Sequence, residues 1–291
     1  MIRTAAVLIA TLALMGCPPA DKPKADPKAA DVKKPTKSDK KADAEAKKKA
    51  AAAAKSVVPA GVVHVKNDKW EDKEASKDKP AVDTKASAEA VGKAGAAFTA
   101  QHKKACAAGA DKVVTLTQAT SRVGYESYKN GNLPVKGMFK SFGGYAVLGE
   151  TPELHFWADV LSLNSGDPTR DARLLKLFFE AEKPDNALIT FEADSLTGLA
   201  DGKVPPKGGV IEAKGKLSLH GVSVPLTLKL KLIPAKEQDT WMASLAEDTL
   251  LPFDPHALAE PLKTLLAACN HKTMGSSVKL EFDLKLAAGC K

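Results

Sequence analysis

The sequence predicts an all-β fold, an antiparallel up-and-down barrel of about eight strands with a short helical insert, preceded by a disordered N-terminal tether. Two observations carry this prediction. From about residue 111 onward, short runs of alternating apolar and polar residues follow one another, separated by turn signals such as KNGN. Upstream of them, residues 17–56 are almost devoid of large apolar side chains and cannot bury a core.

The first residues have the layout of a secretory signal peptide. Arg3 precedes an apolar run that is too short for a comfortable membrane span. The run ends in LMGC at residues 14–17, which resembles the lipobox of bacterial lipoproteins. In that class the chain is cut before the cysteine, which is lipidated. We therefore expect a signal peptide over residues 1–16 and a lipid anchor on Cys17, because several acyl chains on one residue hold a protein stably to a membrane.

Residues 17–56 form the predicted tether, rich in Lys, Ala and Pro. Residues 18–55 carry twelve Lys against five Asp and one Glu, so they account for +6 of the net charge of +8. The remainder of the chain is close to neutral. A folded domain without a basic surface is not expected to bind nucleic acid.

Residues 57–111 are predicted to be an N-terminal extension that is partly helical. VVPAGVVHV favours one or two short strands, and the polar residues after it favour a loop. Residues 86–107 are typical of a helix weakened by Gly92 and Gly95, which Gly109 would end.

The strands of the barrel are predicted within residues 112–288. In residues 215–232 the apolar positions are odd before His220 and even after Gly221, which indicates a hairpin of two strands with a turn between them. The run SSVKLEFDLKLA closes the series with all its large apolar residues on one face. Such strands have one dry and one wet face, and a closed barrel satisfies this without long free edges.

The helical insert lies near residues 254–270. Asp254 is expected to cap a helix that starts at Pro255, and Pro261 to start a second one. Leu258, Leu262 and neighbouring apolar residues form a stripe, which predicts a helical cover on one end of the sheet.

Three cysteines remain besides Cys17. An exported protein lies in an oxidising compartment, so one disulfide and one free thiol are expected. The pairs 106–269, 106–290 and 269–290 are all open on the sequence. No CxxC motif is present, so neither a redox motif nor a zinc site is indicated.

The order and spacing of these segments resemble the YceI-like family, over residues 112–288. The matching positions are Gly137, Phe139, Arg170, Asp171, Phe178, Pro184, Ile189, Thr190, Phe191, Gly215, Leu217, Leu219, His220, Gly221 and Pro225. Members of this family are exported bacterial proteins with a lipocalin-like barrel that holds a polyisoprenoid chain. The resemblance implies that the dry faces of the strands line a lumen.

A lumen of this kind would bind an isoprenoid lipid or quinone, because a hydrocarbon chain gains free energy from burial and requires no hydrogen-bonding partner. The alternative is that the same side chains simply fill their own core, as in many small barrels. The residues expected to line the lumen are Phe139, Ile189, Phe191, Leu217, Leu219, Leu226, Leu228, Leu230, Leu280 and Phe282.

No catalytic residue, metal ligand or cofactor site is predicted. The six histidines have no metal-ligand spacing, and phosphate-loop, nucleophile-elbow and calcium-loop motifs are absent from the sequence. His220 is expected to shape a turn, and Arg170 with Asp171 to form an ion pair that stabilises one. These observations argue against an enzyme.

The sequence therefore predicts a lipoprotein that binds an isoprenoid-like lipid for sequestration or transport. We expect it in the bacterial cell envelope, lipid-anchored and facing the periplasm, with the membrane and the lipid as its partners. The alternative is a structural or partner-binding lipoprotein with a filled barrel, whose protein partner the sequence does not identify.

Overall fold

The computed structural model describes residues 62–64, 82–269 and 271–290. These residues belong to one unit of the chain, Val58–Lys291. The predicted signal peptide, Cys17 and the tether lie outside the described residues, so these remain predictions.

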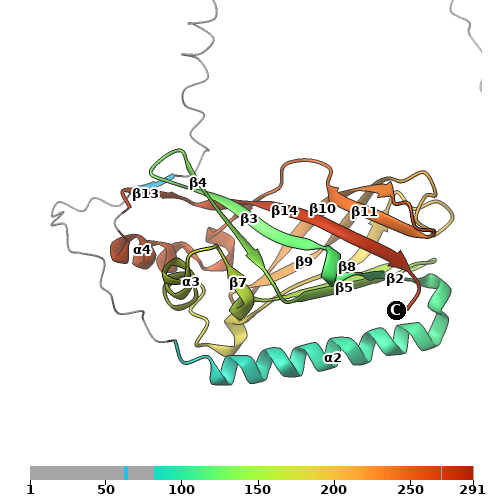
Figure 1. Ribbon diagram of the computed structural model, residues 1–291, viewed down its shortest axis with the longest axis horizontal. Coiled ribbons are helices and arrows are strands. Elements are labelled where there is room, and N and C mark those ends of the chain that lie inside the picture. Colours follow the sequence, from blue (N-terminus) through green and yellow to red (C-terminus); the bar gives the residue numbers. More distant parts are fainter. Residues whose placement is uncertain (1–61, 65–81, 270, 291) are drawn as a thin grey trace, which may run out of the picture. The chain divides into compact units, whose positions relative to one another are not determined.

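Eight antiparallel strands close into a barrel, as the alternation predicts (Figure 1). Each strand pairs with the next in the ring, and the ring closes where Leu286 pairs with Leu116. The ring consists of β2 (Val113–Leu116), β5 (Phe142–Val147), β6 (Glu153–Asp159), β8 (Leu188–Thr197), β9 (Gly209–Leu219), β10 (Val222–Pro234), β11 (Thr240–Leu245) and β14 (Ser277–Ala288). The all-β barrel prediction is therefore confirmed.

Further strands extend the wall at one end of the barrel. A single turn, η2 (Gln118–Thr120), separates β2 from β3, and both strands pair with β14. The additional strands are β1 (Val62–His64), β3 (Arg122–Lys129), β4 (Leu133–Phe139), β7 (Leu163–Asn164), β12 (Leu250–Pro252) and β13 (Thr273–Gly275).

The change of parity in residues 215–232 is the hairpin of β9 and β10. His220 and Gly221 form its two-residue turn with φ of 54° and 72°. Both values lie in the left-handed region that a tight hairpin turn of this kind requires. Each strand then keeps its own parity, so Leu217 and Val224 are paired across the hairpin and lie on the same face of the sheet.

Gly215 is required by close contact rather than by turn geometry. It lies opposite an irregularity in β8, where the register shifts between Ala193 and Ser195. A Cβ atom at this position would lie 2.0 Å from the carbonyl oxygen of Glu192. Only glycine lets β8 and β9 approach this closely.

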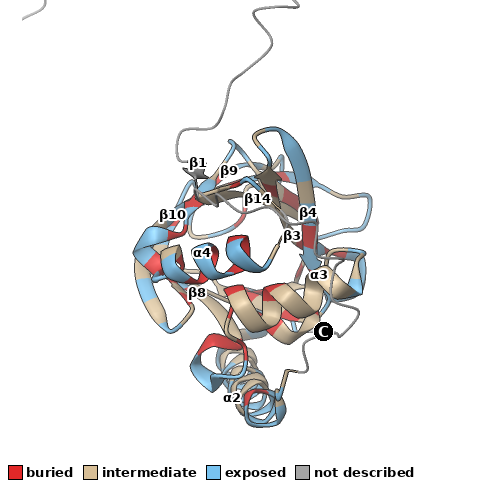
Figure 2. Cartoon of the chain, turned by 90° about the vertical axis from the view of Figure 1, so that its left-hand side faces the viewer, coloured by how far each residue is buried: buried red, intermediate tan, exposed pale blue. Residues whose placement is uncertain are grey.

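A helical cover lies across one end of the barrel (Figure 2). Leu258, Leu262, Leu265 and Leu266 are all buried there, as the apolar stripe predicts. The cover consists of α3 (Pro168–Arg173), the π-helical turn η4 (Leu174–Phe178), the 3-10 turn η6 (Asp254–His256) and α4 (Ala259–Ala268). Two further 3-10 turns are η3 (Val160–Ser162), between β6 and β7, and η5 (Pro184–Asn186), between η4 and β8.

The predicted start of the insert is wrong in one detail. Asp254 does not cap a helix; it lies inside the turn η6, whose N-cap position is Phe253, and no side chain caps that turn. The helix α4 begins at Ala259, with Pro261 in its first turn. The left-handed backbone at Ala257 separates the two segments, so Pro255 starts only a single turn.

The long helix α2 (Lys85–Gly109) confirms the helical part of the extension and lies against the outside of the barrel, followed by η1 (Ala110–Lys112). Phe98 contacts the ring of Tyr145 on β5 and that of Trp157 on β6, with centroids 5.1 and 6.1 Å apart. These aromatic rings lie on the outer face of their strands, where the alternation alone predicts contact with water.

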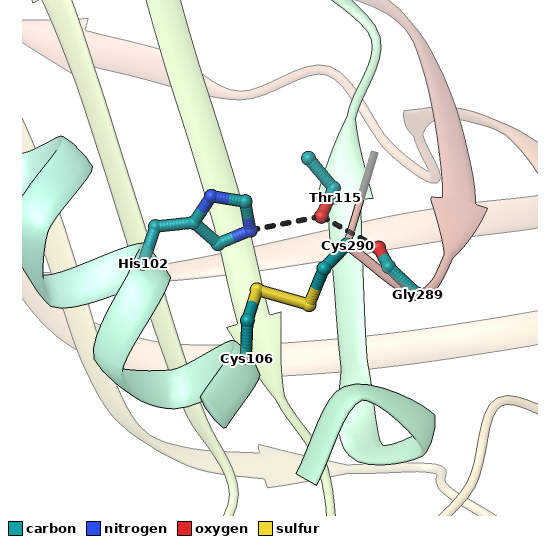
Figure 3. The surroundings of a disulfide bond; sticks show 5 residues. All are labelled: His102, Cys106, Thr115, Gly289 and Cys290. Carbon is teal, nitrogen blue, oxygen red and sulfur yellow. Dashed lines mark hydrogen bonds between the residues drawn. A yellow bond between two sulfur atoms is a disulfide. The ribbon is translucent and has the colours of Figure 1, made fainter. Parts of the chain in front are cut away.

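A disulfide joins the end of α2 to the end of the chain. Cys106 and Cys290 are bonded, and Cys269 is free (Figure 3). Beside the bond, Nε2 of His102 lies 3.1 Å from Oγ1 of Thr115, which donates a hydrogen bond to the carbonyl oxygen of Gly289. Of the three pairings that the sequence allowed, the structure selects 106–290.

In the part of the chain that the structure describes, no helix has both the length and the apolar character needed to cross a membrane.

Candidate functional site

The barrel encloses an apolar cavity, which is the candidate functional site. Its volume is about 190 Å³. Side chains from all the barrel strands except β11 contribute to its wall, and Leu174, Phe178, Phe253, Leu258 and Leu265 of the cover close it at one end. The cavity is therefore shaped jointly by the strands and by the helical insert.

All ten side chains that the sequence singled out line this cavity. They come from five strands, β4, β8, β9, β10 and β14, which are distant in sequence. The structure brings them together because the inward positions of neighbouring strands are in register across the ring. That they contact a ligand remains a prediction.

Several inward-facing residues are not fully covered by protein. Leu280 and Phe282 lie on the inner face of β14 yet are only half-buried, whereas Leu284 on the same face is buried. Leu226 on β10 and Ile189 on β8 are likewise half-buried. In a barrel filled by its own side chains these positions would be buried, so their exposure corresponds to unfilled space in the lumen.

The sequence prediction did not include two polar side chains of the lining. Tyr125 and Ser127 alternate with outward residues on β3, so they share the inward face with Val123. Their oxygens are buried and have no hydrogen-bond partner among the described residues. The alternation in SRVGYESY (residues 121–128) places both on the same face as Val123 and would have predicted them.

The cover is attached to the barrel by polar contacts as well as by its leucines. Nε2 of His220, at the hairpin turn, lies 3.0 Å from a carboxylate oxygen of Glu180, just after η4. His220 thus shapes a turn, as expected, and also ties that turn to the cover. His256 of η6 is buried beside the same hairpin, at Val222, where β10 starts.

Burial of His256 gives the cover a predicted pH dependence. Burial lowers the pKa of His256 below its usual 6.5, partly opposed by a hydrogen bond with the Val222 backbone. The unfolded chain therefore takes up a proton at higher pH than the folded protein does. The folded protein therefore has its full stability above the pKa that His256 has in the unfolded chain. It loses stability as the pH falls below that value.

We expect the free energy of unfolding to fall more steeply for the wild-type protein than for a His256→Gln variant between about pH 7.5 and pH 5. Urea denaturation across this range measures the effect. Parallel curves for the wild type and His256→Gln would contradict the prediction.

The expected ion pair between Arg170 and Asp171 is not formed. Arg170 instead lies 3.6 Å from Asp167, and its guanidinium donates to the carbonyl oxygen of Ser165. Asp171 accepts a hydrogen bond from the Ser165 backbone. The two side chains do not pair with each other; both hold the backbone of Ser165 in the turn before α3.

One group among the described residues has metal-ligand character, formed by His102, Cys106 and Cys290. Their potential ligand atoms lie within 4.8 Å of one another. The two sulfurs are joined in the disulfide, and a thiolate is the form of cysteine that binds metal. In this oxidised form the group acts as a structural link between α2 and the chain end.

Solved structures with a similar fold have been reported from several bacteria. A polyisoprenoid-binding domain from Saccharophagus degradans, implicated in plant cell wall breakdown, is 19% identical, with a TM-score of 0.53 over 60% of this chain and 98% of that one. BcnA from Burkholderia cenocepacia is 19% identical with a TM-score of 0.46, covering 58% and 98%. The YceI protein from Campylobacter jejuni is 21% identical with a TM-score of 0.36, covering 51% and 84%.

No curated protein matches the chain. The model of the YceI-like domain family matches residues 114–286, more than half of the chain and the whole ring from β2 to β14 apart from the last two residues and Val113. Together with the closed barrel around an apolar lumen, this match identifies the chain as a member of the YceI-like family.

Proposed function

We propose that the protein binds an isoprenoid or similar lipid chain in the lumen of its barrel and sequesters or transports it. The apolar cavity carries this proposal, since its lining consists almost entirely of hydrocarbon side chains. Burying a lipid chain there would gain roughly 25 cal/mol for each Å² of apolar surface removed from water. The fold shared with a polyisoprenoid-binding domain supports it.

The second part of the proposal is that the protein is a membrane-anchored lipoprotein of the bacterial cell envelope and faces the periplasm. Its support is the LMGC sequence that ends in Cys17. The 38 residues 18–55 that follow Cys17 would reach on the order of 125 Å when extended. A barrel on such a tether can collect a lipid at one surface and release it away from that surface, without making or breaking a covalent bond.

Native mass spectrometry of the chain without residues 1–16, carrying Cys17→Ser and purified without detergent, tests the binding. We expect a stoichiometric adduct whose extracted mass corresponds to an isoprenoid lipid. A protein that is free of ligand and stays so after incubation with isoprenoid quinones would contradict the proposal and favour a structural or partner-binding lipoprotein. In cells, a full-length Cys17→Ser protein that still fractionates with membranes would contradict the anchor.

A further inference from the structure

We propose that the molecule bound in the lumen carries a hydrogen-bond-accepting oxygen at one end, and that this end lies beside Tyr125 and Ser127 of β3. The inference rests on the proposed function. It adds two properties that an apolar lumen alone does not specify, the polarity of the ligand and its direction in the barrel.

The two hydroxyls stand out in the lining because nearly everything around them is hydrocarbon. Tyr145 is the other lining residue with a polar group on its side chain, but its ring stacks outside the barrel against Phe98 and His102 of α2. Tyr125 and Ser127 are two residues apart on one strand and face the lumen together. They are the two hydroxyl groups on the inward face of β3: Tyr125 lies over Gly137 of β4, and Oγ of Ser127 lies toward Gly275 of β13.

Neither hydroxyl has a partner within the described part of the chain. Oη of Tyr125 and Oγ of Ser127 are both buried without a hydrogen bond, and Ser127 is only 5% exposed. A buried hydroxyl that makes no hydrogen bond destabilises a protein, and replacing it by a hydrocarbon group would remove that cost. A ligand oxygen beside either hydroxyl would supply its missing partner.

The surroundings keep the Tyr125 hydroxyl in place and protonated. A Cβ atom on Gly137 of β4 would lie 2.6 Å from Oη of Tyr125, so the ring lies over this glycine. Burial raises the pKa of Tyr125, the charge of Asp171 raises it further, and Arg170 lowers it. The phenol is therefore a hydrogen-bond donor, which fits a carbonyl or another acceptor oxygen, and it lies within electrostatic reach of α3.

The apolar end of the lumen indicates which way a ligand lies in the barrel. At the junction of β2 and β14, the lining consists of Val114, Leu116 and Leu286. This junction lies at the end of the barrel away from α3 and α4 (Figure 1). A chain with one polar end would thus place its hydrocarbon tail at the junction and its oxygen near the cover.

The test compares two ligands that differ in a single group. One is farnesyl acetone, an isoprenoid with a ketone near its end, and the other is the hydrocarbon in which a methylene replaces the carbonyl. Affinities are measured by calorimetry for the wild-type protein, Tyr125→Phe and Ser127→Ala. Tyr128→Phe is the matched control, because Tyr128 faces outward on the same strand and donates to Glu126.

We expect at least one of Tyr125→Phe and Ser127→Ala to weaken ketone binding by about threefold to tenfold and to leave hydrocarbon binding unchanged. Tyr128→Phe should alter neither affinity. In the ligand-free protein, Tyr125→Phe should not lower the melting temperature, since it removes a hydroxyl without a partner.

Equal effects on both ligands, or none on either, would overturn the inference while leaving the lipid-binding proposal intact. A melting temperature of ligand-free Tyr125→Phe below that of the wild type would also overturn it, because a water would then already satisfy the hydroxyl. Failure of the wild-type protein to bind either compound would contradict the proposed function itself, and this inference with it.

Discussion

Removal of the disulfide with Cys106→Ser and Cys290→Ser together is expected to lower the free energy of unfolding by about 2–5 kcal/mol. The bond joins residues that are 184 positions apart in the sequence. Closing so long a loop restricts the unfolded chain strongly, and the bond also holds α2 against the barrel. Chemical denaturation under non-reducing conditions measures the loss.

Cys269→Ser is the control for this experiment, because Cys269 is the free cysteine. It should change the stability far less than the double variant does. Reduction of the wild-type protein with a dithiol should lower its stability to the level of the double variant. A double variant as stable as the wild type, or a reductant without effect, would contradict the assigned pairing.

Filling the lumen with Ala146→Phe is expected to weaken lipid binding by at least ~10-fold, since a filled lumen leaves little apolar surface for a ligand to bury. Ala146 lies on the inner face of β5 and is one of the small residues of the lining. The new ring would occupy the space that the ligand needs. Calorimetric titration with an isoprenoid hydrocarbon measures the affinity.

Val210→Phe is the control for the lumen variant. Val210 lies on β9, where it is 50% exposed on the outer face, so the same aromatic ring should leave binding unchanged. The melting temperature of Ala146→Phe should stay close to that of the wild type, because the ring enters an existing cavity rather than a packed core. Wild-type affinity in a folded Ala146→Phe protein would contradict binding inside the barrel.

The sequence predicted the barrel and its lining because these depend on local alternation. Residues two apart on a strand share a face wherever that strand lies. Inward positions could therefore be assigned before their neighbours were known, as for Leu228 on β10 and Phe282 on β14. The parity change at His220 likewise required only the knowledge that a tight turn separates two strands.

Details of the cover were less predictable. The apolar stripe correctly indicated that Leu258 and Leu262 would be buried. Asp254 and Pro255 have the residue types of a helix start, but the chain makes only one turn there before its backbone direction changes at Ala257. Arg170 and Asp171 were expected to pair because they are adjacent and oppositely charged, yet both side chains bind the backbone of Ser165 instead.

By itself, the sequence determined that the chain forms a barrel of alternating strands with an apolar interior. Tertiary structure decided which cysteines pair, that α2 covers aromatic residues on the outside of β5 and β6, and that Tyr125 and Ser127 are the polar groups without partners in the lumen. The physical reason is that the alternation of apolar and polar residues along a strand shows on which face each residue lies. Partners across space depend on how strands distant in the chain are arranged around the ring, which no local pattern encodes.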